Sequence, residues 1–296
     1  MRHGFTLVEL AIVLVIIGLL VGGVLTGADL IKSAQINATV SDMQSYTAAA
    51  MTFRDKYGGI PGDLRNDKAA QAGLTVSATN PGTGGEGDGD GLLLNGDASS
   101  AECSGGISVQ PGLGGENTLF WRQLSDAGLI AFKSVADGTC IDTTNFGTGS
   151  TAQTTLAPLI PQLRLRNNGF IQVNSLPAVT QLTNHTNYYT LNNFAAAGTL
   201  GGRLNQSPIL TAREAQGIDT KLDDGFPATG IVTSCSGGHT GFAAPNCLTF
   251  TGGNSGSGNA PSTSNTMCFD NTTTAGVYAV SVDDNLRCGL RIRAGF

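Results

Sequence analysis

Glu9 is a single carboxylate near the start of a run of apolar side chains that continues to Leu25. An ionised carboxylate in lipid costs about 2.5–3.5 kcal/mol on insertion scales, so an acid in this position needs a cationic partner or access to water. Two interpretations follow. Glu9 forms an ion pair with an ammonium group in an apolar environment, or it lies at the membrane surface and its side chain reaches water.

A second candidate for chemistry is the acidic segment 85–97, which reads GEGDGDGLLLNGD. Alternation with glycine lets several oxygen ligands converge, as a hard cation such as calcium requires. The candidate ligands are Glu86, Asp88, Asp90, Asn95 and Asp97. The match to an EF-hand loop fails because Leu92 occupies a position that needs an oxygen ligand. The alternative is a solvated acidic loop, and no cofactor is required by any other motif.

The chain has six cysteines, all beyond residue 100. An even number in an oxidising compartment indicates disulfides, although the sequence alone leaves the pairing open. The simplest prediction pairs neighbours in the sequence: Cys103 with Cys140, Cys235 with Cys247, and Cys268 with Cys288. No C-x-x-C motif occurs, so a zinc ribbon or a thioredoxin-like centre has no support.

Enzyme motifs find little support. His185 and His239 stand in no recognisable nucleophile or metal motif. Gly82, Gly84 and Gly87 match G-x-G-x-x-G formally. No predicted strand precedes these glycines and no helix follows them, so the match does not indicate a dinucleotide site. We expect a protein that is not an enzyme.

The element that positions Glu9 is a predicted transmembrane helix over residues 5–28. Its apolar stretch reaches the roughly 20 residues that span a hydrocarbon core of about 30 Å. Arg2 and His3 precede the stretch, and Asp29 is the first acid after it. This charge bias predicts a cytoplasmic N-terminus and an extracytoplasmic remainder. No small-x-small site for ordinary signal cleavage follows the run.

The helix is predicted to continue through residues 29–57 as an amphipathic segment. Its apolar residues recur at spacings of three, four or seven, which draws one stripe along the helix. They are Ile36, Val40, Met43, Ala50, Phe53 and Tyr57. Gly58, Gly59 and Pro61 then end the helix.

Residues 58–296 are predicted to form one extracytoplasmic head. The 42 glycines and 13% charged residues indicate a domain rich in loops. Residues 75–117 and 252–265 are glycine-rich segments, and residues 117–132 are predicted as a helix with Asn117 as its N-cap. Short strands are predicted at 170–173, 231–232, 248–250 and 277–282.

Residues 4–10 read G-F-T-L-V-E-L, directly before the apolar run. This motif resembles the class III signal of type IV pilins and of the pseudopilins of type II secretion. The resemblance implies that residues 1–4 are a leader, cut off between Gly4 and Phe5 by a prepilin peptidase that then methylates the amino group of Phe5. It also implies that Glu9 pairs with the Phe5 ammonium of a neighbouring subunit.

The resemblance further implies an α+β, pilin-like fold, in which the long N-terminal helix packs on a small antiparallel sheet with glycine-rich, disulfide-bonded insertions. It supplies the sheet, since the short strand signals alone do not. Residues 57–63 (YGGIPGD) and 222–227 (LDDGFP), with the G-D-G-D-G loop, resemble segments of large pilin-like proteins. Pilin-like proteins often have a disulfide near the C-terminus, in agreement with the predicted Cys268–Cys288 pair.

The expected function is a structural subunit of a type IV pilus or of a type II secretion pseudopilus. The expected partners are other pilin subunits, in a homopolymer or heteropolymer, the prepilin peptidase and an inner-membrane assembly platform. The chain would lie in the bacterial inner membrane before assembly, and afterwards in a periplasmic pseudopilus or an extracellular pilus. The alternative is a minor tip pilin whose large head serves adhesion or DNA uptake. The formal net charge of −6 argues against nucleic-acid binding through bulk charge.

Overall fold

The computed structural model describes residues 6–77, 87–93, 113–139, 141, 151–166, 168–175, 186–196, 204–236, 268–270, 276–280, 286 and 288–296. Its longest element is α1 (Leu7–Tyr57), a helix of 51 residues. Thr6 caps the N-terminus of this helix, and Gly58 ends it in the left-handed conformation with φ of 75°. The predicted continuous helix is confirmed.

The second half of α1 packs against the head. The predicted stripe faces the core, where Met43, Ala50 and Phe53 are at most 2% exposed. Ile36 and Tyr57 pack against the same core and are partly buried. The 3.6-residue period therefore identified the buried face of this half correctly.

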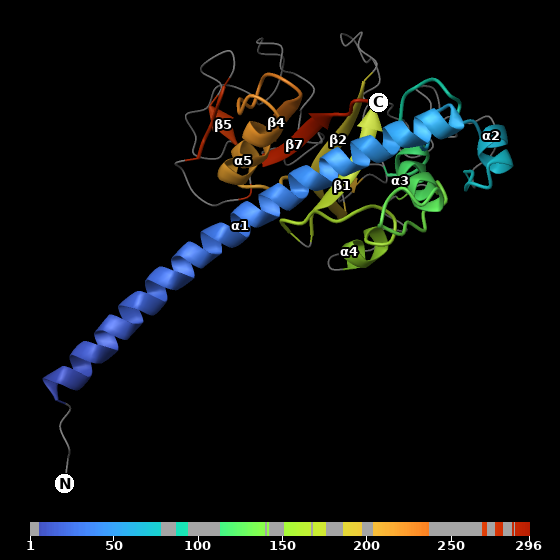
Figure 1. Ribbon diagram of the computed structural model, residues 1–296. Helices are drawn as coiled ribbons and strands as arrows, with labels where there is room; N and C mark the ends of the chain where they lie inside the picture. The colour runs from blue at the N-terminus through green and yellow to red at the C-terminus, as the bar shows by residue number, and fades with distance from the viewer. Residues whose placement is uncertain are drawn as a thin grey trace.

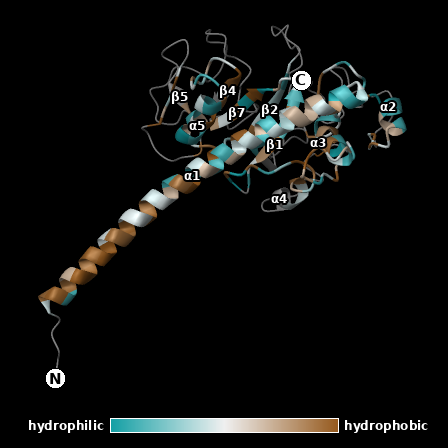
Figure 2. Cartoon of the chain, in the orientation of Figure 1, coloured by the Kyte–Doolittle hydropathy of each residue, from teal (hydrophilic) through white to brown (hydrophobic). Residues whose placement is uncertain are grey.

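The first half of α1 projects away from the head into open space (Figure 1). Each large apolar side chain from Leu7 to Ile31 is at least 50% exposed. Figure 2 shows this projecting half as the most hydrophobic stretch of the described chain. By length and composition α1 is able to cross a membrane.

The head is built on an antiparallel sheet of five strands. Its order is β1-β2-β7-β4, and β3 pairs with an extension of β2. The strands are β1 (Phe170–Ser175), β2 (Asn187–Ala196), β3 (Leu204–Ser207), β4 (Val232–Ser236) and β7 (Cys288–Arg293). One face of the sheet carries Tyr189, Leu191 and Leu290, and all three side chains are fully buried. The hydroxyl of Tyr189 is 3.5 Å from Thr47 Oγ1, so this face packs on α1.

Short elements surround the sheet. They are α2 (Asn66–Gln71), α3 (Glu116–Asp126), α4 (Thr151–Leu156), α5 (Ala212–Leu222), β5 (Phe269–Asp270) and β6 (Val277–Tyr278). Helix α5 lies against α1 at Gly217, where a Cβ atom would stand only 3.1 Å from Ile36 Cδ1. Strands β5 and β6 pair with each other in a separate antiparallel ribbon.

An aromatic cluster joins the elements of the head. Trp121 of α3 makes edge contacts with Tyr46 of α1 and with Phe120, at centroid distances of 4.9 Å. Phe120 stacks on the C-terminal Phe296 at 5.4 Å, and Tyr189 of β2 lies beside both rings. Such contacts add to the energy of apolar burial, so the cluster holds α1, α3, the sheet and the C-terminus in one core.

The predicted short elements are partly right. The strand at 170–173 lies within β1, and the strand at 231–232 overlaps β4, which begins at Val232. The helix predicted at 117–132 is α3, but it begins at Glu116 after Gly115 and ends at Asp126. Asn117 is therefore not the N-cap; it lies in the first turn and is 1% exposed.

Within the segment predicted as a strand at 277–282, the structure has a two-residue strand, β6, at Val277–Tyr278. The segment 248–250 lies outside the described residues. Strand β6 pairs with β5.

The disulfide between Cys268 and Cys288 is confirmed, with its Cα atoms 5.0 Å apart. It links the residue before β5 to the first residue of β7. Cys103, Cys140 and Cys247 lie outside the described residues, as does the side chain of Cys235. The other two pairings stay predictions.

Candidate functional site

Glu9 lies in the first turn of α1 and takes part in a capping box with Thr6. Its carboxylate accepts hydrogen bonds from Thr6 N at 2.9 Å and from Thr6 Oγ1 at 3.0 Å, while Thr6 Oγ1 accepts from Glu9 N. The helix dipole also favours an anion at this end. Glu9 therefore has partial compensation for its charge within its own chain, one turn after the predicted cleavage site.

Gly4 and Phe5, the predicted cleavage and methylation sites, lie outside the described residues. Their roles, and the pairing of Phe5 with Glu9 of another subunit, stay predictions. Glu9 is exposed and lies at the tip of the projecting apolar half of α1, where a second chain can reach it.

The predicted calcium loop is described in part. Asp88 Oδ1 accepts from Asp90 N at 2.9 Å, and Asp90 Oδ1 accepts from Leu92 N at 2.7 Å, so both side chains cap turns of their own loop. The remaining predicted ligands, Glu86, Asn95 and Asp97, lie outside the described residues. The five residues are thus not tested as a ligand set.

Asp63 is a member of this site that the sequence did not suggest. Gly89 N donates to its Oδ1 at 2.7 Å and Gly91 N donates to its Oδ2 at 2.9 Å. Carboxylate oxygens of Asp63, Asp88 and Glu116 lie within 4.8 Å of one another, a grouping able to hold a hard cation. Asp63 is the last residue of the YGGIPGD segment, but no local sequence signal links it to Glu116, which follows 53 positions later.

Burial dominates the electrostatics of Asp63, which is 2% exposed. Burial raises its pKa to about 7, and the charges of Asp90 and Asp88 act in the same direction. The two backbone N–H groups oppose the shift because they favour the ionised form. A cation bound here would stabilise the carboxylate and lower this pKa.

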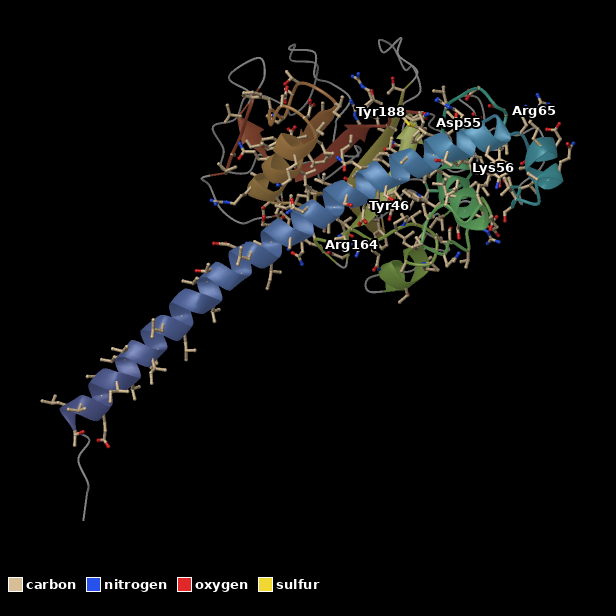
Figure 3. All side chains as sticks on the ribbon, in the orientation of Figure 1. Tyr46, Asp55, Lys56, Arg65, Arg164 and Tyr188 are labelled. Carbon is tan, nitrogen blue, oxygen red and sulfur yellow. A yellow bond between two sulfur atoms is a disulfide. The ribbon has the colours of Figure 1, made fainter. Side chains whose placement is uncertain are left out.

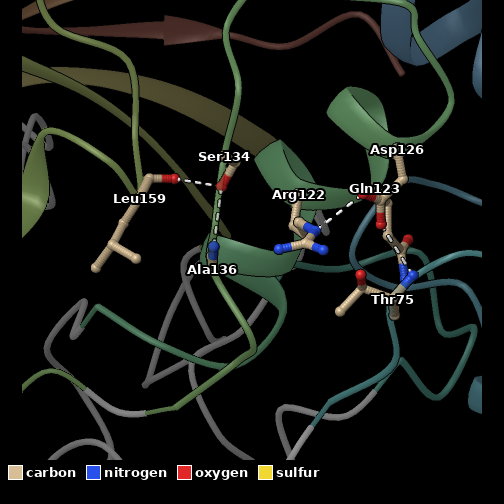
Figure 4. A network of polar contacts seen from close by, with 7 residues as sticks. All are labelled: Thr75, Arg122, Gln123, Asp126, Ser134, Ala136 and Leu159. Carbon is tan, nitrogen blue, oxygen red and sulfur yellow. Dashed lines mark hydrogen bonds and ion pairs between the residues drawn. The ribbon is translucent and has the colours of Figure 1, made fainter.

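The position of Asp63 depends on a clamp between its loop and α3. Gln123 Oε1 accepts from Gly62 N at 2.7 Å, and Gln123 Nε2 donates to Thr75 O at 3.0 Å. Gly62 has φ of 86°, and a Cβ atom there would stand 2.4 Å from Glu116 O. Figure 4 shows the contact of Gln123 with Thr75 beside the ion pair of Arg122 with Asp126. The loop can approach α3 this closely only with glycine at position 62.

A second acidic cluster lies in the last turn of α5 and in the residues that follow this helix. Carboxylate oxygens of Asp219, Asp223 and Asp224 lie within 4.8 Å of one another. Asp219 is fully buried and accepts hydrogen bonds from Tyr278 Oη at 2.8 Å and from Gly225 N at 3.2 Å. Burial raises its pKa to about 6.

The other two carboxylates of this cluster hold the loop that leads into β4. Asp223 Oδ2 accepts from the backbone N–H groups of Ile231 and Val232. Asp224 accepts from Thr229 Oγ1 at 2.6 Å, and this bond lowers its pKa. The cluster therefore has a structural explanation in turn formation.

The structure does not test the prediction that the histidines and the glycine-rich match form no enzyme site. His185 and His239, together with Gly82 and Gly84, lie outside the described residues. The expectation that they form no catalytic, metal or dinucleotide site stays a prediction.

Comparison with known protein families gives one match: residues 1–25 match the prokaryotic N-terminal methylation motif. No curated protein and no solved structure matches the chain. The matched segment covers the start of α1 and none of the head.

A methylation motif at the start of a long apolar helix that packs on an antiparallel sheet is typical of pilin-like proteins. Together these features support the type IV pilin and pseudopilin family for this chain, as a structural subunit. Such a motif implies processing by a prepilin peptidase, membrane anchoring before assembly, and assembly with other pilin subunits. It suggests a structural role rather than an enzymatic one.

Proposed function

We propose that the chain is a precursor anchored in the bacterial inner membrane, cut between Gly4 and Phe5 and N-methylated at Phe5. It then becomes a structural subunit of a type IV pilus or of a type II secretion pseudopilus. The observation that carries this proposal is the apolar, exposed first half of α1, which begins within the methylation motif.

The exposed apolar surface of α1 needs a cover. Burying one large aliphatic side chain is worth about 1.5–3 kcal/mol, and the projecting half carries such side chains on all its faces. A bilayer covers them before assembly, and the apolar helices of neighbouring subunits cover them in a filament. A helix that is apolar all round supports both surroundings.

Glu9 makes the transfer between these surroundings selective. In the single chain its carboxylate accepts two hydrogen bonds from Thr6. In the filament we propose that it pairs with the Phe5 ammonium of a neighbour, since a buried carboxylate that faces a buried cation is far less costly than either alone. This ammonium exists only after cleavage, so processing and assembly are coupled.

The proposed topology keeps Arg2 and His3 in the cytoplasm and the head outside it. The Cys268–Cys288 disulfide supports an oxidising compartment for the head. The assembly platform of the inner membrane is the proposed site of polymerisation.

Replacement of Glu9 by glutamine tests the proposal. Glu9→Gln keeps the size and can still cap the helix, but it removes the charge that the neighbour's ammonium needs. We expect insertion into the membrane at the wild-type level and loss of filaments in sheared material. The matched control is Asp29→Asn, an exposed acid on the same helix, which should assemble normally. Normal filaments from Glu9→Gln would contradict the proposal.

A further inference from the structure

The sheet has a second face, turned away from α1, with a row of polar side chains. The register places Gln172 of β1 opposite Thr190 of β2, Thr190 opposite Arg291 of β7, and Arg291 opposite Thr233 of β4. Successive side chains of a strand alternate between faces. Since the apolar neighbours Leu290 and Ile292 point into the core, Arg291 points to the other side of the sheet.

Tyr188 and Arg293 lie next to Arg291 on this face. The guanidinium carbon of Arg291 is 4.2 Å from the centroid of the Tyr188 ring, a cation–π contact. Tyr188 pairs directly with Arg293, whose side chain is exposed. Figure 3 labels Tyr188 beside β2, near the rim of the head. Two arginines and one aromatic ring thus form a compact group on the outer face.

Apart from the Tyr188 ring, the charge of Arg291 has no compensating carboxylate within the described part of the chain. Its Nε and Nη1 atoms are inaccessible to solvent and have no hydrogen-bond partner there. Burial lowers the pKa of the guanidinium, the interaction with Tyr188 opposes this shift, and the positive charge of Arg293 adds to it. A buried donor without a partner is costly, and a buried charge more so.

Other arginines of the head show how this fold normally satisfies such groups. Arg164 binds Asp42 at 2.8 Å, Arg166 binds Glu214 at 3.0 Å, and Arg122 binds Asp126 at 2.9 Å. No carboxylate of the described residues is paired in this way with Arg291 or Arg293. Among the described arginines without a carboxylate partner, Arg291 is the one with buried guanidinium nitrogens that lack a hydrogen bond.

We propose that Tyr188, Arg291 and Arg293 form a binding site for one oxyanion group, either a carboxylate or a phosphate. The ring of Tyr188 contacts the Arg291 guanidinium and helps to hold it in place, and the protein excludes water from the Nε and Nη1 side, which strengthens the field at the accessible side. Arg293 closes the site from the neighbouring position on β7. The inference does not depend on polymerisation, because the site lies on the head and away from α1.

Titration calorimetry on the full processed chain in nonionic detergent tests the site. The probes are sodium phosphate and sodium malonate, added at constant ionic strength, and they distinguish a phosphate from a carboxylate ligand. We expect at least one of them to bind with saturation at one site per chain. Arg291→Gln and Arg293→Gln should each weaken that binding by about tenfold or more, as loss of a charge-assisted hydrogen bond predicts.

The matched control is Arg213→Gln, which removes the same charge from an exposed position on α5. It should leave the affinity unchanged. If Arg291→Gln does not fold, Arg293→Gln alone decides, since the Arg293 side chain is exposed and its loss leaves the core intact. Saturation by neither anion, or equal weakening by Arg213→Gln, would overturn the proposal.

Discussion

Replacement of Gln123 by methionine should destabilise the head strongly, although methionine has nearly the same size and shape. Gln123 is 1% exposed and forms two hydrogen bonds with the backbone, to Gly62 N and to Thr75 O. Methionine can neither accept the first bond nor donate the second. The backbone N–H of Gly62 would then be buried without a partner, and the half-buried carbonyl of Thr75 would lose its bond.

The magnitude follows from these two bonds. A buried donor that loses its partner costs about 1–3 kcal/mol and an ordinary hydrogen bond is worth about 0.5–1.5 kcal/mol, so the two together predict a loss of about 1.5–4.5 kcal/mol. This is a large part of the stability of an ordinary domain. The loop at 58–64 should also loosen, because the bond from Gly62 N is one of its attachments to α3.

Urea unfolding of the full chain in nonionic detergent measures this loss. Trp121 is the single tryptophan of the chain and is fully buried, so its fluorescence reports the core. The matched control is Gln71→Met, at an exposed position of α2, with an expected change below about 0.5 kcal/mol. If Gln123→Met loses less than about 1 kcal/mol, with an unchanged dependence of the unfolding free energy on urea concentration, the two hydrogen bonds of Gln123 do not hold the loop as described.

Three further predictions concern the head. The pKa of Asp63 in the folded protein is about 7, above its ordinary value of 3.8, so the folded state binds this proton more tightly than the unfolded state. The free energy of unfolding should therefore fall as the pH rises between these two values. Urea unfolding at several pH values measures this dependence, and Asp63→Asn should flatten it. Replacing Cys268 and Cys288 together by serine should cost about 3 kcal/mol, since the disulfide closes a loop with a sequence separation of 20. Calcium should raise the melting temperature at about pH 7, and Asp88→Asn should abolish this rise; a melting temperature that calcium leaves unchanged would remove the calcium prediction.

The sequence could predict elements whose signals are local. The stripe from Val40 to Phe53 has a helical period, and Gly58 marks the end of α1, so both were found. Helix α5 was missed, although Thr211 and Glu214 form a capping box whose spacing is visible in the sequence. That signal could have found it.

Other features depend on contacts between distant segments. Strand β2 carries Thr190 and Asn192 as buried residues on the outer face, so its sequence lacks the alternation of polar and apolar residues that marks a strand. Asp63 meets Glu116 only because Gly62 packs against the first turns of α3. The residue pattern of a single sequence does not show which distant segments come into contact.

Mass spectrometry of the N-terminus of the chain, recovered from sheared filaments, is the decisive test of processing at Gly4 and assembly through the N-terminal helix. We expect a first residue at Phe5 that carries one added methyl group, with residues 1–4 absent. A chain in filaments that retains residues 1–4, or that begins beyond Glu9, would show that the proposed processing and assembly are wrong.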